Sequence, residues 1–464
     1  MRIMIFGTGI IFFRFWPYLD KKQVVCLIDN NTNKIGKYID GVKIVSPDEL
    51  MYYDYDAVLI LSLHYLEMKK QLAELGVSES IVYHYGEIGN LFRREITICN
   101  GGQRSALDIW IHGNCNNKKI LLLSHELSRT GASIALMNMA RILRKMGHSV
   151  IYAGVVGGTL IQELEADGLE YICDWGFVSQ EEQKECIEKF DMAVICSYGL
   201  KMYVQEYSGL CIPILWWIHE AEEFYRGKME TSGVGENVHV YCGGKYAREI
   251  FQAHYKASDT KILQYCIPED ESAAAGRKGA SDRICIALIG TVCKRKAQDV
   301  LLRAVSSLSL EYQERLEVLM VGSVLKAEQN YWDTQESLVK GLENVRMIGE
   351  VSQKELAQIY QGLDVLVCPS RDDPMPIVVT QAMMYGKVCI ISENVGQVEF
   401  IRQGENGFIF HSQDELTALL KWVVDNKDKM ADIGKRARQI YEQNFSDWVM
   451  EEKLRLFIED NVQH

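Results

Sequence analysis

The chain has 464 residues, of which 48% are hydrophobic and 24% charged, and its formal net charge is −13 at pH 7. At roughly 150 residues per domain, this length predicts about three domains. The proportions are those of a globular protein. The acidic balance argues against a general nucleic-acid binder, because neutralising phosphates requires clustered Lys and Arg. No nucleic-acid partner is therefore expected.

Thirteen cysteines are scattered singly, and no Cys-x-x-Cys occurs. Several, such as Cys196 and Cys368, sit in apolar runs where a thiol behaves as a small hydrophobic group. This usage favours a reducing compartment over a disulfide framework. We therefore expect a cytoplasmic protein.

The first block, residues 1–95, opens with an apolar run that resembles a signal peptide, but Gly7 and Gly9 interrupt it. A strand that leads into Gly-x-Gly, with Asp29 about twenty positions on, is typical of dinucleotide-binding sites. Phe12 stands where the third glycine belongs. A Rossmann-like domain without a cofactor is favoured over an NAD-linked one. The block resembles the small Rossmann-like domains found ahead of sugar-modifying enzymes, which implies an accessory or regulatory role.

Short apolar runs alternate with amphipathic helical windows along the rest of the chain, as in parallel α/β sheets. This pattern predicts two further Rossmann-like domains, at residues 119–272 and 283–440, with a small polar linker at 271–282. Ligands of such folds bind between the domains, at the carboxyl ends of the strands. Residues 441–464 are expected to form a helix that crosses back to the second domain. The expected strands are 120–124, 149–153, 192–196, 214–218 and 238–241, then 283–289, 316–321, 345–348, 365–368 and 388–391.

A glycine turn with two adjacent cations follows the first strand of the third domain. Gly290 lets the backbone approach a ligand, and Arg295 and Lys296 can neutralise a diphosphate without a metal. The alternative is a solvated basic turn. Its position at the carboxyl edge of the sheet favours a binding site.

The segment from Asp373 to Gln381 is the most informative. Two prolines fix the loop before a helix that begins near Ile377, and free backbone N–H groups at that helix start form an anion site. Asp373 precedes the turn and Gln381 lies inside the helix, so both could face one ligand. Helix capping by Asp372 or Asp373 is the structural alternative.

Together these segments resemble the glycosyltransferase family 4 enzymes, which have a GT-B fold and retain anomeric configuration. That family carries Glu-x7-Glu, and the second of these glutamates begins the sequence Glu-Ala-Met-x-x-Gly. Here the spacing survives as Asp373-x7-Gln381 and continues Ala-Met-Met-Tyr-Gly386. The resemblance covers residues 119–460, and its other motifs are residues 290–296, 124–132, 217–220, 396–399 and 405–407.

The resemblance implies a role for each matched residue. Arg295 and Lys296 would bind the donor diphosphate and stabilise charge on the leaving group. Asp373 would contact the sugar, Gln381 the ribose, and His219 the reacting centre. Retention by front-face attack needs no carboxylate nucleophile. The expected catalytic residues are His219, Asp373, Arg295 and Lys296; the donor-binding residues add Gly131, Gly290, Gly322, Met375, Pro376, Ile377, Val378 and Gln381; the acceptor side holds Glu126, Ala132 and Glu220.

Departures from the family leave a second reading open. Asp373 and Gln381 replace both family glutamates, and Ala297 replaces a glycine. A catalytically inactive partner or chaperone subunit therefore remains the alternative to an active hexosyltransferase. No metal site is predicted, because the Asp54-Tyr-Asp56 pair reads as a polar turn ahead of a strand.

The expected substrates are a nucleotide sugar and a glycan, lipid-linked or polysaccharide acceptor. Related enzymes dock on anionic lipid, and the window 134–145 is amphipathic with Arg141, Arg144 and Lys145 near its end. A peripheral contact with the inner membrane face is therefore expected. The alternative is that these cations complement the helix C-terminus.

Overall fold

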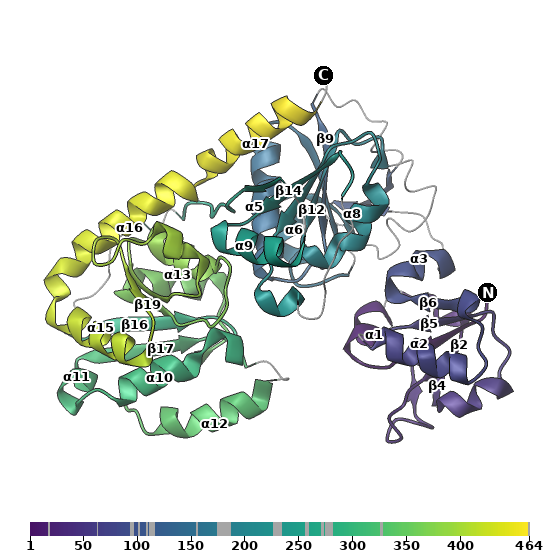
Figure 1. The fold of residues 1–464 in the computed structure, drawn as a ribbon, viewed down its shortest axis with the longest axis horizontal. Coiled ribbons are helices and arrows are strands. Elements are labelled where there is room, and N and C mark those ends of the chain that lie inside the picture. The colour runs from purple at the N-terminus through teal and green to yellow at the C-terminus, as the bar shows by residue number, and fades with distance from the viewer. Residues whose placement is uncertain are drawn as a thin grey trace.

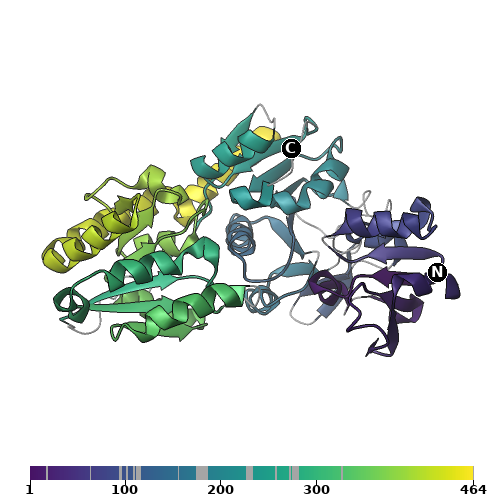
Figure 2. The same cartoon turned by 60° about the horizontal axis from the view of Figure 1, so that its bottom comes forward.

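The fold was analysed in a computed structural model. It describes residues 1–16, 19–62, 64–92, 97–100, 103–107, 110, 117–154, 156–173, 187–225, 234–255, 259–270, 273, 282–324 and 328–462. These residues form three sheets, and each sheet with its helices is called a domain below. Figure 1 shows the three domains in sequence along the chain, and Figure 2 shows them after rotation. The predicted linker lies almost wholly outside the described residues.

The first domain is an open sheet in the order β3-β4-β2-β1-β5-β6. Its central strand β1 pairs in parallel with β2 and β5, and all four of its side chains are buried. The run that could pass for a signal peptide therefore supplies a central strand and the helix after it. The elements are β1 (Ile3–Phe6), α1 (Ile10–Phe15), β2 (Val24–Ile28), β3 (Tyr38–Ile39), β4 (Val42–Val45), β5 (Ala57–Ile60), α2 (Tyr65–Glu74), β6 (Val82–His84) and α3 (Ile88–Leu91).

The second domain has the strand order β15-β14-β13-β12-β9-β10-β11-β7-β8. Its parallel strands are apolar because helices cover both faces of the sheet. A hairpin not foreseen from the sequence, β7–β8, extends one edge antiparallel to β11. The elements are β7 (Thr97–Asn100), β8 (Gln103–Ala106), β9 (Lys119–Ser124), α5 (Gly131–Lys145), β10 (Ser149–Gly154), α6 (Ile161–Ala166), β11 (Glu170–Cys173), β12 (Met192–Cys196), α8 (Lys201–Tyr207), β13 (Ile214–Ile218), β14 (Val238–Cys242), α9 (Lys245–His254) and β15 (Thr260–Ile262).

The third domain is a parallel sheet in the order β18-β17-β16-β19-β20-β21. The strands expected from the sequence are all present, with ends that differ by one residue at most. The elements are β16 (Ile284–Ile289), η9 (Lys294–Lys296), α10 (Gln298–Ser306), α11 (Leu310–Glu314), β17 (Leu316–Val321), α12 (Gln329–Lys340), β18 (Val345–Gly349), α13 (Gln353–Gly362), β19 (Val365–Cys368), α14 (Ile377–Met384), β20 (Val388–Ser392), η11 (Gly396–Phe400), β21 (Phe408–Phe410) and α15 (Gln413–Asp425).

The last two helices run from the third domain to the second (Figure 1). α16 (Met430–Asn444) packs against α14, and α17 (Asp447–Asn461) packs against α5. The ring of Phe457 meets the rings of His239 and Tyr241 edge-on, at centroid distances of 5.5 and 5.8 Å. The chain end therefore ties the two domains together.

The first domain contacts the second through an apolar cluster. Val156, in the loop after β10, is buried in the same cluster as Ile3, Phe12 and Trp16. The carbonyl of Val156 accepts a hydrogen bond from the backbone N–H of Leu127, at 2.8 Å. The accessory domain therefore abuts the loop that leads to α5. None of the helices in the described parts of the chain is both long and apolar enough to cross a bilayer.

Candidate functional site

The turn after β16 is shaped by two glycines whose backbones touch. Gly290 has φ of +148° and Gly322, after the neighbouring strand β17, has φ of +138°. A Cβ on Gly322 would lie 2.1 Å from the carbonyl oxygen of Gly290. Only glycine fits this close approach. The pair fixes where the chain leaves the sheet, and the side chain of Lys296 lies directly over Gly290.

Ala297 joins this turn to α10 in a left-handed conformation, with φ of 56° and ψ of 42°. This is the position where the family pattern has glycine. A left-handed alanine costs roughly 1 to 2 kcal/mol because Cβ crowds the following carbonyl. Since Ala297 is fully buried, the surrounding packing holds it in place.

Asp373 lies at the centre of an ion cluster. Its carboxylate is 2.5 Å from Nζ of Lys296 and 3.4 Å from Nη1 of Arg295, and it accepts a hydrogen bond from Ser370 at 3.3 Å. Only 6% of Asp373 is exposed. Burial favours its neutral form, but the two cations outweigh burial and hold the pKa of Asp373 below its usual value. The cluster is therefore a buried carboxylate held between two partly exposed cations.

Two helix N-termini face each other beside this cluster. α14 begins at Ile377, and its N-cap residue Pro376 provides no side-chain cap. α5 begins at Gly131, whose Cβ position would lie 3.8 Å from Cδ1 of Ile377. Backbone N–H groups at both helix starts add positive potential to that of the two cations. The arrangement suits a ligand with more than one negative charge.

The loop before α14 is anchored by buried polar contacts. Gln397 donates to the carbonyl of Pro376 at 2.8 Å and to the hydroxyl of Thr380 at 3.2 Å, and Tyr265 hydrogen-bonds Thr380 at 2.8 Å. Tyr265 belongs to the segment after β15 in the second domain. The start of α14 is therefore fixed from both domains.

His219 and Glu220 follow β13 in the second domain. The ring of His219 is partly buried against Trp217, and its Nε2 has no hydrogen-bond partner among the described residues. Burial lowers the pKa of His219 to about 3, so the imidazole is neutral at physiological pH. Glu220 accepts from the backbone N–H groups of Tyr198 and His219, while burial raises its pKa. A neutral imidazole can exchange a hydrogen bond with a ligand but supplies no charge.

Glu126 lies on the same side of the molecule, after β9. Its carboxylate is 3.3 Å from Nε2 of His125 and accepts from Ser128 at 3.2 Å. β9 and β13 both pair with β12, where Cys196 lies opposite Ser124 on one side and Trp217 on the other, so the two strand ends are one strand apart. Ala132 follows Gly131 in the first turn of α5. The expected acceptor-side residues are thus grouped at the carboxyl ends of β9 and β13.

Direct contacts join the second and third domains at the site. Glu399 accepts from the backbone N–H of Lys245 at the start of α9, at 3.1 Å. Arg295 approaches Glu223 to 3.5 Å, and Tyr246 donates to Asp372 at 3.3 Å. The methyl group of Met375 lies so close to Gly244 that a Cβ there would be 2.3 Å away. The two domains are therefore in contact around the ion cluster.

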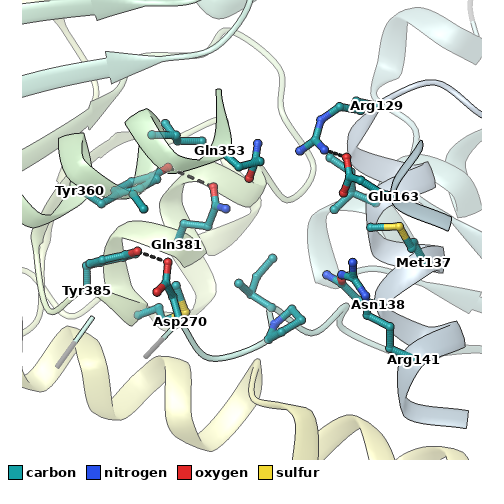
Figure 3. A pocket seen from close by; sticks show the side chains of 16 residues that line it. Arg129, Met137, Asn138, Arg141, Glu163, Asp270, Gln353, Tyr360, Gln381 and Tyr385 are labelled. Atoms are coloured by element: carbon teal, nitrogen blue, oxygen red, sulfur yellow. Dashed lines mark hydrogen bonds and ion pairs between the residues drawn. The ribbon is translucent and has the colours of Figure 1, made fainter. Parts of the chain in front are cut away.

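A pocket of about 170 Å³ lies between the same two domains (Figure 3). Gln381 faces Arg129, Asn138 and Arg141 across it. Oε1 of Gln381 accepts a hydrogen bond from the hydroxyl of Tyr360 at 3.1 Å. The lining residues are Arg129, Ile134, Met137, Asn138, Arg141, Glu163, Ile267, Pro268, Asp270, Gln353, Leu356, Ala357, Tyr360, Gln381, Met384 and Tyr385.

The structure brings some of the predicted residues together and separates others. Arg295, Lys296 and Asp373 meet directly, whereas Gln381 lines the pocket and Asp373 does not. The carbonyl of Val378 accepts from Tyr360 at 3.2 Å, so it faces the α13 side rather than the ion cluster. Sequence reasoning missed Tyr360, because it lies 21 positions from Gln381 and no motif links the two.

Three other sequence features have intramolecular partners. Arg141 bonds Asp167 and Arg144 bonds the carbonyls of Asp167 and Gly168, so these cations complete the C-terminus of α6. Asp29 accepts from Lys34 at 2.8 Å and from the backbone of Thr8 at 3.1 Å. Membrane contact and the absence of a nicotinamide cofactor both stay predictions.

The paired aspartates of the first domain, Asp54 and Asp56, both contact Arg2, which fits the polar turn expected there. The described residues contain no group of three or more His, Cys, Asp or Glu side chains placed to hold a metal ion. Metal independence nevertheless stays a prediction, because a donor diphosphate could itself bring a cation.

The fold is that of the GT-B proteins, and comparison with known families identifies the family. Residues 271–440 match the family described as glycosyl transferases group 1, and residues 116–239 match glycosyl-transferase family 4. Residues 1–83 match the C2185-like N-terminal family. Over its second and third domains the chain belongs to the group 1, family 4 glycosyltransferases.

Individual relatives agree with this assignment. The chain is 27% identical over 180 residues to D-inositol 3-phosphate glycosyltransferase 2 of Catenulispora acidiphila, covering 37% of this chain and 42% of the relative. It is 28% identical over 158 residues to granule-bound starch synthase 1 of Pisum sativum, covering 34% and 25%. The matches span about a quarter to a half of the curated relatives' lengths. Anabaena Alr3699/HepE in complex with UDP-glucose has the same fold, with a TM-score of 0.61 at 18% identity over 74% of this chain and 100% of that one.

Proposed function

We propose that this chain is an active, retaining, metal-independent glycosyltransferase that moves a hexosyl group from a nucleotide sugar to a glycan, lipid-linked or polysaccharide acceptor in the cytoplasm. The observation that carries the proposal is the ion cluster of Arg295, Lys296 and Asp373 beside the facing starts of α5 and α14. The solved relatives that carry UDP or UDP-glucose support a nucleotide-sugar donor.

The proposed chemistry follows from the charges at the site. The diphosphate lies between the helix starts, where Lys296 and Arg295 contact its oxygens. As the bond from the anomeric carbon to the phosphate oxygen breaks, these cations stabilise the charge that builds on the leaving diphosphate. The acceptor hydroxyl forms the new bond on the same face, and its proton passes to the leaving phosphate. Asp373 holds sugar hydroxyls, and His219 contributes one neutral hydrogen bond.

The pocket at Gln381 is the proposed site of the nucleoside. The pocket is lined by residues of α5 and α14, the two helices whose starts form the proposed diphosphate site, and Gln381 offers an amide to the ribose. Because the amide is uncharged, its hydrogen bonds to the ribose are weaker than those of the carboxylate in the family pattern. We expect nucleoside binding to depend more on the fit of the pocket than on this one contact.

One observation favours the alternative, a catalytically inactive partner subunit: Asp373 forms ion pairs with both cations that would bind the diphosphate. Thermal unfolding in the presence of UDP, GDP and their sugars, followed by an assay for released nucleotide, separates the two readings. A nucleotide at about 100 times its Kd stabilises the chain by about 2.7 kcal/mol. Stabilisation with turnover supports the enzyme, and stabilisation without turnover from any donor supports the partner subunit.

A further inference from the structure

Arg371 holds the two segments of the ion cluster together without touching Asp373. It lies in the loop after β19, two residues before Asp373. Its Nη1 donates to the carbonyl of Lys294 at 2.6 Å, and its backbone N–H donates to the carbonyl of Arg295 at 2.8 Å. Both acceptors lie in the cationic turn η9. Arg371 therefore fixes that turn against the loop that carries Asp373.

The guanidinium of Arg371 is itself held by Asp299 in the first turn of α10. Its Nη2 reaches both carboxylate oxygens, at 2.9 and 2.7 Å, and the hydroxyl of Tyr331 from α12 donates to the same carboxylate at 2.7 Å. Asp299 is only 4% exposed. Burial raises its pKa, but the hydrogen bonds from Arg371 and Tyr331 prevail and the pKa stays below its usual value. The charge of Arg371, whose side chain is 41% exposed, is thus paired with the buried carboxylate of Asp299.

We propose that Asp299, Arg371 and Tyr331 form a clamp that positions Arg295 and Lys296 for the donor diphosphate, in an account that rests on the proposed function. The cations lie in a short turn of three residues and cannot hold a fixed direction alone. Arg371 donates hydrogen bonds to two backbone carbonyls of that turn. With its backbone held in this way, the turn directs the side chains of Arg295 and Lys296 towards one point. Arg371 is a positioning residue, because its guanidinium is already paired with the carboxylate of Asp299.

The clamp has a matched control on the same carboxylate. Arg303 also approaches Asp299, at 3.6 Å, but it is 55% exposed along its side chain and is one helical turn further along α10. No hydrogen bond joins Arg303 to the described residues of the cationic turn. Loss of Arg303 therefore removes a charge near Asp299 and leaves the turn in place.

The test is the affinity of the full-length chain for UDP, and for GDP if UDP does not bind, measured by calorimetry in the wild type, Arg371→Ala and Arg303→Ala. We expect Arg371→Ala to weaken nucleoside diphosphate binding about tenfold or more. The guanidinium bonds to Asp299 and to the carbonyl of Lys294 are lost, so Arg295 and Lys296 are no longer held towards the phosphates, although the backbone hydrogen bond to Arg295 remains. We expect Arg303→Ala to stay within about twofold of the wild type. Equal affinities in Arg371→Ala and Arg303→Ala would overturn the clamp.

Two further measurements separate positioning from simple stability. Uridine lacks phosphates, so Arg371→Ala should bind it as the wild type does; an equal loss of uridine and UDP affinity contradicts the positioning role. If Arg371→Ala does not fold, Tyr331→Phe removes only one hydroxyl, and an unchanged UDP affinity in that variant rejects the inference. A wild-type chain that binds neither UDP nor GDP contradicts the proposed function and this inference together, whereas a binding wild type with unaffected variants contradicts this inference alone.

Discussion

Substituting Asp373 by Asn tests the electrostatics of the ion cluster. The change removes the negative charge between Lys296 and Arg295, whose side chains are 17% and 29% exposed. Removing one partner of a fully buried pair costs about 3–5 kcal/mol. Because water reaches both cations in part, we expect a smaller loss of about 2 kcal/mol. For a domain of this size that lowers the unfolding midpoint by about 4–8 °C.

The same substitution should strengthen diphosphate binding. In the wild type a diphosphate must compete with Asp373 for both cations, and in Asp373→Asn it replaces the missing counter-charge. We therefore expect UDP to raise the unfolding midpoint of the variant more than that of the wild type, while sugar transfer falls. Differential scanning fluorimetry against UDP concentration measures both effects. A variant as stable as the wild type, or one that UDP stabilises less, would refute the reasoning.

Asp372→Asn is the matched control, since it removes a neighbouring carboxylate that bonds Tyr246 and whose pKa burial raises. It should leave UDP binding unchanged. The pH dependence has a definite sign. The pKa of Asp373 is lowered on folding, so its contribution to stability is present above the unfolded value of about 3.9 and is lost as the pH falls below it. The difference in stability between wild type and Asp373→Asn should therefore shrink below about pH 4.

Three further results are expected. The pKa of His219 is about 6.5 in the unfolded chain and about 3 in the folded protein, so protonation favours unfolding below pH 6.5. The free energy of unfolding in urea should therefore fall by about 1.4 kcal/mol per pH unit between pH 6 and 4 in the wild type, relative to His219→Gln. Parallel pH curves for the two proteins would contradict the buried neutral ring. In the same urea titration, Gly322→Ala should lower the free energy of unfolding by at least about 2 kcal/mol, because the new Cβ would clash with the carbonyl of Gly290. Gly362→Ala is the control: its Cβ would meet nothing within 4 Å, so the substitution should be neutral or stabilising. Val156→Asp should destabilise the contact between the first two domains. Limited proteolysis would report this as faster release of the first domain than in the wild type, and an unchanged rate would argue against that contact.

Much of the fold could be predicted because its signal is local. Buried parallel strands are short apolar runs, and β12, β13, β17 and β19 have the predicted bounds. The turn at Gly290 and the helix start at Ile377 could also be placed, since glycine and proline restrict the backbone at those positions. Local restrictions of this kind are legible in one sequence.

The rest depends on contacts between distant residues. Lys296 and Asp373 lie 77 positions apart, and nothing in their spacing shows that they form an ion pair with each other. Gln381 matched a family position, yet its partner Tyr360 comes from another helix and turns it towards the pocket. The hairpin β7–β8 was missed because an edge pairing is specified by the strand it joins, here β11. The helix expected from residue 134 begins at Gly131, where the side chain of Thr130 accepts from the backbone of Ser133.

The most direct test of the account is nucleotide release from a panel of nucleotide sugars by the wild type, Lys296→Ala and Lys294→Ala. Lys294 is an exposed cation in the same turn and serves as the matched control. We expect turnover with at least one donor, a loss of about a hundredfold or more in Lys296→Ala, and nearly unchanged turnover in Lys294→Ala. Equal turnover in both variants, or none from any donor in the wild type, would contradict a donor diphosphate site at Lys296.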